Sequence, residues 1–206
     1  MIPAGWHGPR TRKEIHVEFT IYSDFTCAEC YGLNEQLVTF GLSGSARVRW
    51  KGVQHEPALG APMRALERRA LNRVDDEISE VKRRVSGIVM HLPKGKPNTK
   101  KAIIAVASVM RQQPARAAAF RDAIYRAYWR DGTDLSVMAE LQGIADHSGV
   151  PRIVSLDHPD ADPMVENWDL DWATERLGGV PRVIRGDGKI IWGLKPTDEA
   201  SAFFQV

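Results

Sequence analysis

The 206-residue sequence lacks a long apolar segment and a marked excess of charge of either sign, and it contains only two cysteines. No apolar run reaches the roughly 20 residues that a membrane-spanning helix needs. The 28 basic and 26 acidic residues nearly cancel, so charge gives no reason to expect a nucleic-acid or membrane partner. A signal peptide would need an apolar core and a small-residue cleavage site, and we find neither. We therefore expect a cytoplasmic protein.

Cysteine is scarce, and both copies lie together, at positions 27 and 30. A structural zinc site would need two further Cys or His ligands at suitable spacing, but the sequence has no second pair of this kind and its six histidines are scattered. The acidic, proline-containing stretch 157–162 is typical of a surface linker rather than a set of metal ligands. We expect no metal site.

The two cysteines stand where a predicted strand passes into a predicted helix. Residues 14–22 are rich in β-branched and aromatic residues, and apolar residues recur at helical spacing over about 27–41. Cys27 would then lie at the helix N-terminus, where unpaired amide groups and the helix dipole favour a thiolate. Cys30 would follow one turn later, and this context indicates redox chemistry rather than a permanent bridge.

The rest of the chain predicts a second strand, a long helical block and a hairpin. Residues 46–53 alternate like a strand, and joining it to the first strand through a helix makes the two parallel. Helical spacing then dominates as far as about residue 150. A short helix is expected over 166–177, and Gly186-Asp-Gly188 predicts a hairpin turn between strands 182–184 and 189–194. A final helix begins near Pro196.

This order predicts an α/β fold: a thioredoxin-like mixed sheet with a large all-helical insertion between its βαβ and ββα halves. The expected parts are a flexible arm over 1–13, an N-terminal half over 14–62, the insertion over 63–165 and a C-terminal half over 166–206. The sequence leaves open whether the protein is a monomer or a homodimer.

Several stretches in this order resemble the DsbA-like branch of the thioredoxin superfamily. Residues 23–32 (SDFTCAECYG) are similar to its Asp-x-x-Cys-Pro-x-Cys-Tyr pattern, and 97–99, 120–136 and 179–184 resemble its insertion and its Gly-Val-Pro strand entry. The likeness is closest to the group of FrnE-type oxidoreductases and 2-hydroxychromene-2-carboxylate isomerases. It implies a cis bond between Val180 and Pro181 beside the cysteines, where the Val180 backbone would pair with an extended thiol substrate.

The chain departs from the pattern between the cysteines. Ala28 replaces the family's proline, and Glu29 stands where relatives often carry an aromatic residue or histidine. A carboxylate near Cys27 would disfavour its thiolate by like-charge repulsion, which predicts a mild oxidant or a reductant. Asp24, three residues before Cys27, would serve either as a proton relay or as a helix cap.

The pair predicts a thiol–disulfide oxidoreductase that acts on protein thiols and disulfides or on glutathione. Cys27 would attack a substrate disulfide, and Cys30 would then attack Cys27 and release the reduced substrate. No cofactor is expected, although glutathione could act as a co-substrate.

Two alternatives stay open. In a glutathione-dependent isomerase or transferase of the same fold, Asn98 and the Val180 backbone would contact glutathione. A non-catalytic redox sensor or binding module would result if Ala28 and Glu29 left Cys27 unreactive.

Overall fold

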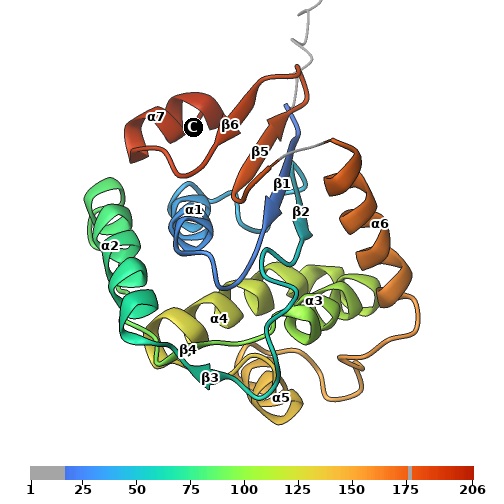
Figure 1. Ribbon diagram of the computed structural model, residues 1–206. Coiled ribbons are helices and arrows are strands. Elements are labelled where there is room, and N and C mark those ends of the chain that lie inside the picture. Colours follow the sequence, from blue (N-terminus) through green and yellow to red (C-terminus); the bar gives the residue numbers. More distant parts are fainter. Residues whose placement is uncertain (1–16, 176–177) are drawn as a thin grey trace, which may run out of the picture.

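The computed structural model describes residues 17–175 and 178–206 (Figure 1). The arm predicted over 1–13, the first residues of the strand predicted from position 14, and Leu177 lie outside the described residues. The elements, in chain order, are β1 (Phe19–Ser23), α1 (Ala28–Thr39), β2 (Val48–Gly52), β3 (Arg64–Ala65), α2 (Arg68–Arg84), β4 (Gly95–Lys96), α3 (Lys100–Gln112), α4 (Pro114–Asp131), α5 (Met138–His147), α6 (Ala161–Thr174), β5 (Arg182–Arg185), β6 (Ile190–Trp192) and α7 (Thr197–Phe204).

Both ends of the chain build one four-stranded sheet, in the order β2-β1-β5-β6. β1 runs parallel to β2 and antiparallel to β5, and β6 returns antiparallel to β5. The predicted βαβ unit, the hairpin and the shared mixed sheet are therefore confirmed.

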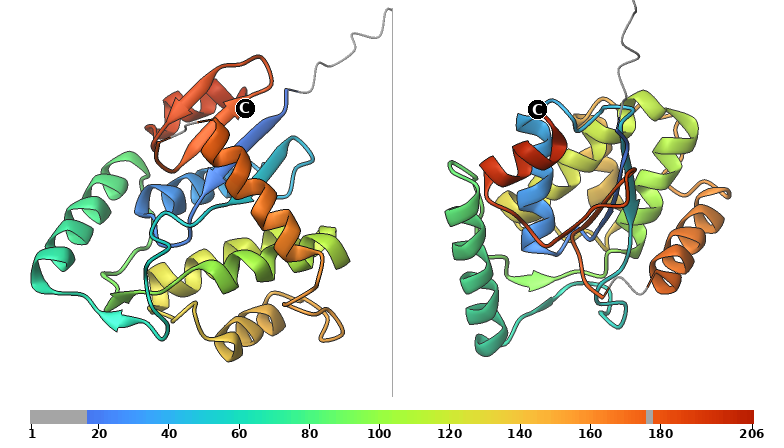
Figure 2. Two further views of the ribbon diagram at one scale, coloured as in Figure 1. Left: turned by 45° about the vertical axis from the view of Figure 1, so that its right-hand side comes forward. Right: turned by 90° about the horizontal axis from the view of Figure 1, so that it is seen from above.

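Helices cover both faces of this sheet. Seen from above, α1 and α7 lie on one side and α3 and α6 on the other (Figure 2). On the first side Phe19 packs on Phe204 of α7, with ring centroids 4.8 Å apart. On the second side Tyr22 packs on Trp172 of α6, at 5.3 Å. β1 is a central strand covered on both faces, and all of its residues are buried except Thr20, which is half-buried.

The insertion wraps α1 from the side that faces away from the sheet. α2 stands beside α1 (Figure 1) and buries Val74, Ile78 and Val81, which recur at helical spacing. α3 and α4 form an antiparallel pair around Pro114, which occupies the first turn of α4 where a missing N–H costs nothing. Every helix in the described part of the chain is too short or too polar to cross a membrane.

The structure differs from the prediction at two places in this region. The insertion, expected to be all-helical, contains a two-residue ladder in which Arg64 pairs with Lys96. A ladder this short leaves no periodic pattern in the sequence. The helix expected at 166–177 begins at Ala161, because Pro163 falls in the first turn and does not interrupt it.

Candidate active site

The two cysteines occupy the start of α1 with their thiols in different surroundings. Cys27 is the N-cap residue, with extended backbone (φ −86°, ψ 118°), and its Sγ accepts a hydrogen bond from the Cys30 backbone N–H at 3.2 Å. Cys27 is partly exposed, whereas Cys30 is 1% exposed, and both are free thiols. Cys27 is therefore accessible to a substrate, whereas Cys30 is buried beneath it.

The Val180–Pro181 loop lies beside Cys27, and its peptide bond is cis, as the resemblance implied. The sheet explains this placement: Tyr22 at the end of β1 pairs with Arg182 at the start of β5. The loop before β5 and the loop after β1 must then adjoin. The Cys27 thiol donates a hydrogen bond to the Val180 carbonyl oxygen at 3.5 Å.

Polar groups surround the buried Cys30 sulfur. Burial raises the pKa of the Cys30 thiol, and the adjacent Cys27 raises it further, while hydrogen bonds with the Ser23 side chain and the Asp24 backbone act in the opposite direction. Ser23 Oγ in turn lies 2.5 Å from the hydroxyl of Tyr125 on α4. Cys30 thus keeps its proton at rest but has a hydroxyl within reach.

Asp24 does not cap the helix, so that prediction is wrong: Cys27 holds the N-cap position. The Asp24 carboxylate instead accepts hydrogen bonds from the backbone N–H groups of Thr26 (3.1 Å) and His55 (2.6 Å). Burial raises the pKa of this carboxyl. The bonds tie the cysteine loop to the chain after β2, and the proton-relay role stays a prediction.

Glu29 is paired with a cation, which bears on the argument from repulsion. Its Oε1 forms an ion pair with Arg84 at the end of α2 (2.9 Å), and its Oε2 accepts from the Leu194 N–H (3.3 Å). Arg84 also donates to the Leu194 carbonyl oxygen at 3.0 Å. The guanidinium of Arg84, which Glu29 shares with Glu80 (2.8 Å), therefore offsets part of the repulsion expected from an isolated carboxylate beside Cys27. Ala28, the other residue of the dipeptide, is buried as the first residue of α1.

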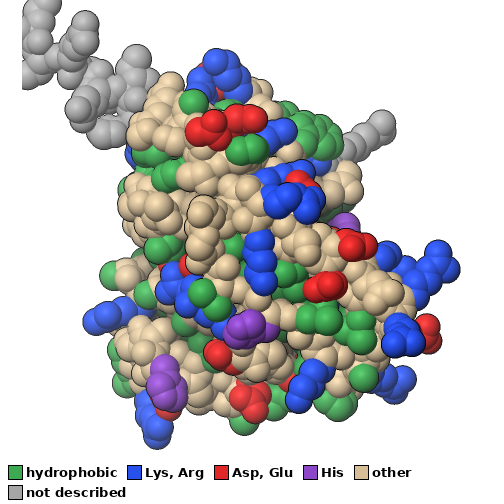
Figure 3. Space-filling view, turned by 90° about the vertical axis from the view of Figure 1, so that its left-hand side faces the viewer, with side chains coloured by type: hydrophobic (Ala, Val, Ile, Leu, Met, Phe, Trp, Pro, Cys, Tyr) green, Lys and Arg blue, Asp and Glu red, His purple; other side chains and the backbone are tan. Residues whose placement is uncertain are grey.

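A cleft of about 660 Å³ opens beside Cys27. Val180 and His55 contribute to its lining, and α2 contributes charged side chains of both signs, among them Arg73 and Glu77. The face of the molecule that includes α2 likewise shows basic and acidic side chains interspersed (Figure 3). The cleft therefore presents no uniform charge to a ligand.

The structure does not bring Asn98 to this cleft. Asn98 Oδ1 accepts hydrogen bonds from the Gln54 side chain (2.9 Å) and the Lys100 N–H (3.0 Å), and its Nδ2 donates to the Leu59 carbonyl oxygen (2.6 Å). Asn98 thus holds the 54–59 loop, whose His55 does line the cleft.

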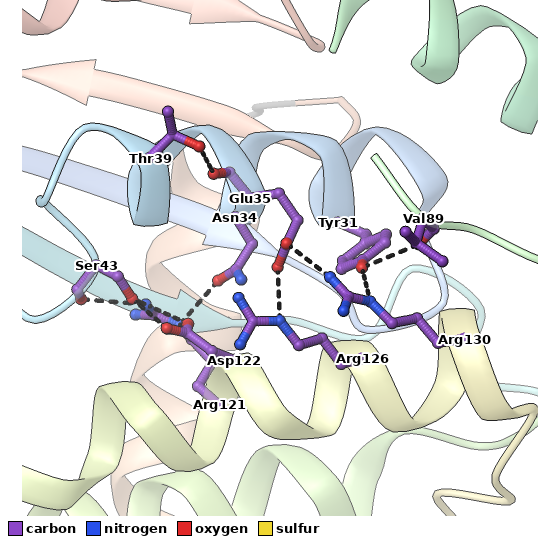
Figure 4. Close-up of polar contacts among 10 residues, drawn as sticks. All are labelled: Tyr31, Asn34, Glu35, Thr39, Ser43, Val89, Arg121, Asp122, Arg126 and Arg130. Carbon is purple, nitrogen blue, oxygen red and sulfur yellow. Dashed lines mark hydrogen bonds and ion pairs between the residues drawn. The ribbon is translucent and has the colours of Figure 1, made fainter. Parts of the chain in front are cut away.

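A polar cluster fastens α1 to α4 just after the cysteines (Figure 4). Glu35 forms ion pairs with Arg126 and Arg130, each at 3.0 Å. The Tyr31 hydroxyl accepts from Arg130 Nε at 2.8 Å and donates to the Val89 carbonyl oxygen at 3.2 Å. This cluster fixes the cysteine-bearing helix against the insertion.

Sequence reasoning missed several residues of this site, among them Ser23, Tyr125 and Arg84. Ser23 directly precedes Asp24, so its nearness to the cysteines was open to inference. Tyr125 lies 102 positions from Ser23 and Arg84 lies 55 from Glu29. No spacing rule links residues that far apart.

A thioredoxin-like protein is defined by this combination of a mixed sheet, a Cys-x-x-Cys pair at a helix start and an adjoining cis-proline loop. The chain belongs to the DSBA-like thioredoxin domain family, whose model matches residues 18–205. No curated protein matches the chain.

Solved structures share the fold at low sequence identity. A probable DsbA oxidoreductase from Streptomyces coelicolor superposes with a TM-score of 0.71 at 17% identity, covering 92% of this chain and 89% of that one. The cytosolic disulfide reductase DsbM from Pseudomonas aeruginosa gives 0.69 at 13%, covering 91% and 97%. A 2-hydroxychromene-2-carboxylate isomerase gives 0.65 at 17%, covering 91% and 92%. At these identities the likeness shows the fold alone.

Proposed function

We propose that the protein is a thiol–disulfide oxidoreductase in which Cys27 is the nucleophile and Cys30 the resolving thiol. One observation carries this proposal: Cys27 Sγ accepts the Cys30 N–H at 3.2 Å at the mouth of a cleft, with the buried Cys30 thiol one turn behind it. A sulfur at the N-cap receives both an amide hydrogen bond and the positive end of the helix dipole, and both favour a thiolate.

The chemistry needs no cofactor. The Cys27 thiolate attacks a substrate disulfide, a mixed disulfide forms, and one substrate sulfur leaves as a thiol after taking up a proton. Cys30 then attacks Cys27 Sγ, the Cys27–substrate bond breaks, and the proton lost by Cys30 ends on the second released thiol. The reverse sequence oxidises a dithiol substrate.

The Val180 backbone and Pro181 would bind the substrate chain beside Cys27. Val180 lines the cleft and its carbonyl oxygen already lies 3.5 Å from Cys27 Sγ. An extended segment that contains the target sulfur would therefore pass along this loop as it approaches the thiolate.

We propose protein thiols or glutathione as partners, and the cytoplasm as the location. The structural neighbour DsbM is a cytosolic disulfide reductase and has also been solved with glutathione. The pairing of Glu29 with Arg84 weakens the argument that Glu29 makes the pair a mild oxidant or a reductant, so the direction of exchange is left to measurement of the redox potential.

A second candidate is a glutathione-dependent isomerase, because a cleft of about 660 Å³ beside Cys27 is large enough for a small-molecule ligand. Such an enzyme would use the thiol of bound glutathione and would not need Cys30.

Substitution of Cys30 by serine separates the two functions. An exchange enzyme reduces insulin with glutathione as the electron donor, and its Cys30→Ser variant accumulates a mixed disulfide on Cys27 that mass spectrometry detects. Cys27→Ser is the matched control, and it should form no adduct. If wild type leaves insulin oxidised and Cys30→Ser forms no adduct, the proposed function is wrong.

A further inference from the structure

Two buried hydroxyl groups meet behind the cysteines. Ser23 ends β1 and Tyr125 lies in the middle of α4, yet Ser23 Oγ and the Tyr125 hydroxyl are 2.5 Å apart. Ser23 is 2% exposed and Tyr125 is fully buried. Because both hydroxyls are buried, their hydrogen-bond partners must come from the protein.

The Ser23 side chain also lowers the pKa of the Cys30 thiol, so the two hydroxyls lie together beside this sulfur. A serine hydroxyl has one proton to donate and an oxygen that accepts. If that proton points at the Cys30 sulfur, the oxygen must accept from Tyr125. Burial and the neighbouring cysteines raise the pKa of Tyr125, so the phenol keeps the proton it would donate.

Aromatic contacts fix the position of the Tyr125 ring beside the cysteine loop. It packs against Phe25 with ring centroids 4.7 Å apart and against Tyr31 at 6.1 Å. Phe25 precedes the cysteine pair and Tyr31 follows it, so the ring contacts both flanks of the redox loop. Trp129 Nε1 donates to the Phe25 carbonyl oxygen at 2.9 Å, which secures the same loop to α4.

The acidic group closest in sequence is engaged elsewhere. Asp24 directs its carboxylate to the backbone N–H groups of Thr26 and His55, and only its backbone interacts with Cys30. A neutral hydroxyl has an advantage over a carboxylate at this point, because a second negative charge would oppose formation of the Cys30 thiolate.

We propose that Ser23 donates a hydrogen bond to the Cys30 sulfur as it becomes a thiolate in the resolving step, and that Tyr125 positions Ser23 by donating to its oxygen. The proposal rests on the exchange function proposed above. In this step the Cys27–Cys30 bond forms, the bond between Cys27 and the substrate sulfur breaks, and the Cys30 proton ends on the released thiol. No external oxidant or reductant takes part.

The test uses the full-length reduced protein and the aromatic disulfide 5,5′-dithiobis(2-nitrobenzoate). Attack by Cys27 releases one equivalent of the coloured thiolate, and attack of Cys30 on the resulting mixed disulfide releases the second. Stopped-flow absorbance therefore reports the two cysteines as two phases. We expect Ser23→Ala to slow the second phase about tenfold, as loss of a hydrogen bond to a developing charge predicts. Tyr125→Phe should slow it about threefold, because it acts through Ser23. The first phase should be unchanged in both variants.

Tyr128→Phe is the matched control. Tyr128 is another buried tyrosine of α4, and its hydroxyl donates to the Gly95 carbonyl oxygen at 3.0 Å, away from the cysteines. It should leave both phases at the wild-type rate. The proposal is overturned if the second phase is unaffected by Ser23→Ala, or if both phases slow equally, which would indicate a general disturbance of α1. A wild type that releases no second equivalent would instead refute the exchange function itself.

Discussion

The ion pair between Glu29 and Arg84 should set the redox potential of the Cys27–Cys30 pair. Arg84 replaced by alanine leaves the Glu29 carboxylate without its cation next to Cys27, whereas Glu29 replaced by glutamine removes that carboxylate and leaves Arg84 paired with Glu80. The two substitutions therefore act with opposite sign on the Cys27 thiolate. Because the disulfide form carries no thiolate, each effect falls on the reduced state only.

The magnitude follows from Coulomb's law. Two unit charges about 8 Å apart at an effective dielectric constant of about 40 interact by ~1 kcal/mol. Both side chains of the pair are about one-third exposed, so a larger value would ignore solvent screening. For a two-electron couple ~1 kcal/mol corresponds to about 20 mV. We expect Arg84→Ala to lower the potential by about that amount, Glu29→Gln to raise it by about that amount, and the double variant to lie near wild type.

The assay is equilibration with glutathione redox buffers, with the oxidised fraction read by thiol trapping. Arg83→Ala is the control, because Arg83 is the adjacent arginine of α2, pairs with Glu80 and is 68% exposed. It should leave the potential unchanged. A potential for Arg84→Ala that equals wild type, or that moves in the same direction as Glu29→Gln, would refute the electrostatic argument.

Three further substitutions test the stability of the folded protein. Because burial raises the pKa of Asp24 in the folded protein, the native state binds this proton more tightly than the unfolded chain, and this group makes the free energy of unfolding fall as pH rises from about 4 through the folded pKa. Asp24→Asn removes this pH dependence. The free energy of unfolding of the variant minus that of wild type, measured by urea denaturation, should therefore be larger at pH 7 than at pH 4. A difference independent of pH would contradict this. A Cβ on Gly95 would collide with the Arg64 backbone carbonyl oxygen, so Gly95→Ala should cost ~1–3 kcal/mol. Gly143→Ala, in open space on α5, should instead stabilise by ~0.5–1 kcal/mol. Equal effects at the two glycines in thermal unfolding would show that the close approach at Gly95 has no cost.

Local patterns in the sequence carried most of the fold. The alternation of 46–53, the turn at Gly186-Asp-Gly188 and the helical spacing after Cys27 each depend on neighbours within a few residues, and the structure confirms all three. The start of α6 could not be predicted in this way. Proline is compatible with the first turn of a helix but not with its interior, and the local sequence does not show that Pro163 lies in a first turn.

In the candidate site, too, features set by neighbouring residues could be predicted and tertiary contacts could not. Cys27 and Cys30 are recognisable because three residues of spacing place both in one helical turn. The pairing of Glu29 with Arg84 is a tertiary contact between two helices, and it weakens the effect of the carboxylate without leaving any sign in the sequence near the cysteines. Asp24 shows the same limit, since its partner His55 is reached only once β2 lies beside β1.

One residue of the insertion acts on each cysteine. The residue that acts on Cys27 affects the redox potential, and the residue that acts on Cys30 affects the rate of the resolving step. Arg84 of α2 acts through Glu29 on the Cys27 sulfur of the reduced pair, so it changes the equilibrium potential. Tyr125 of α4 acts through Ser23 on Cys30. Since burial keeps that thiol protonated at rest, a hydrogen bond to its thiolate is realised only during the resolving step and changes a rate. The two helices can therefore set the potential and the resolving rate separately. Arg84→Ala should move the potential and leave the second nitrobenzoate phase close to wild type, whereas Ser23→Ala should do the reverse.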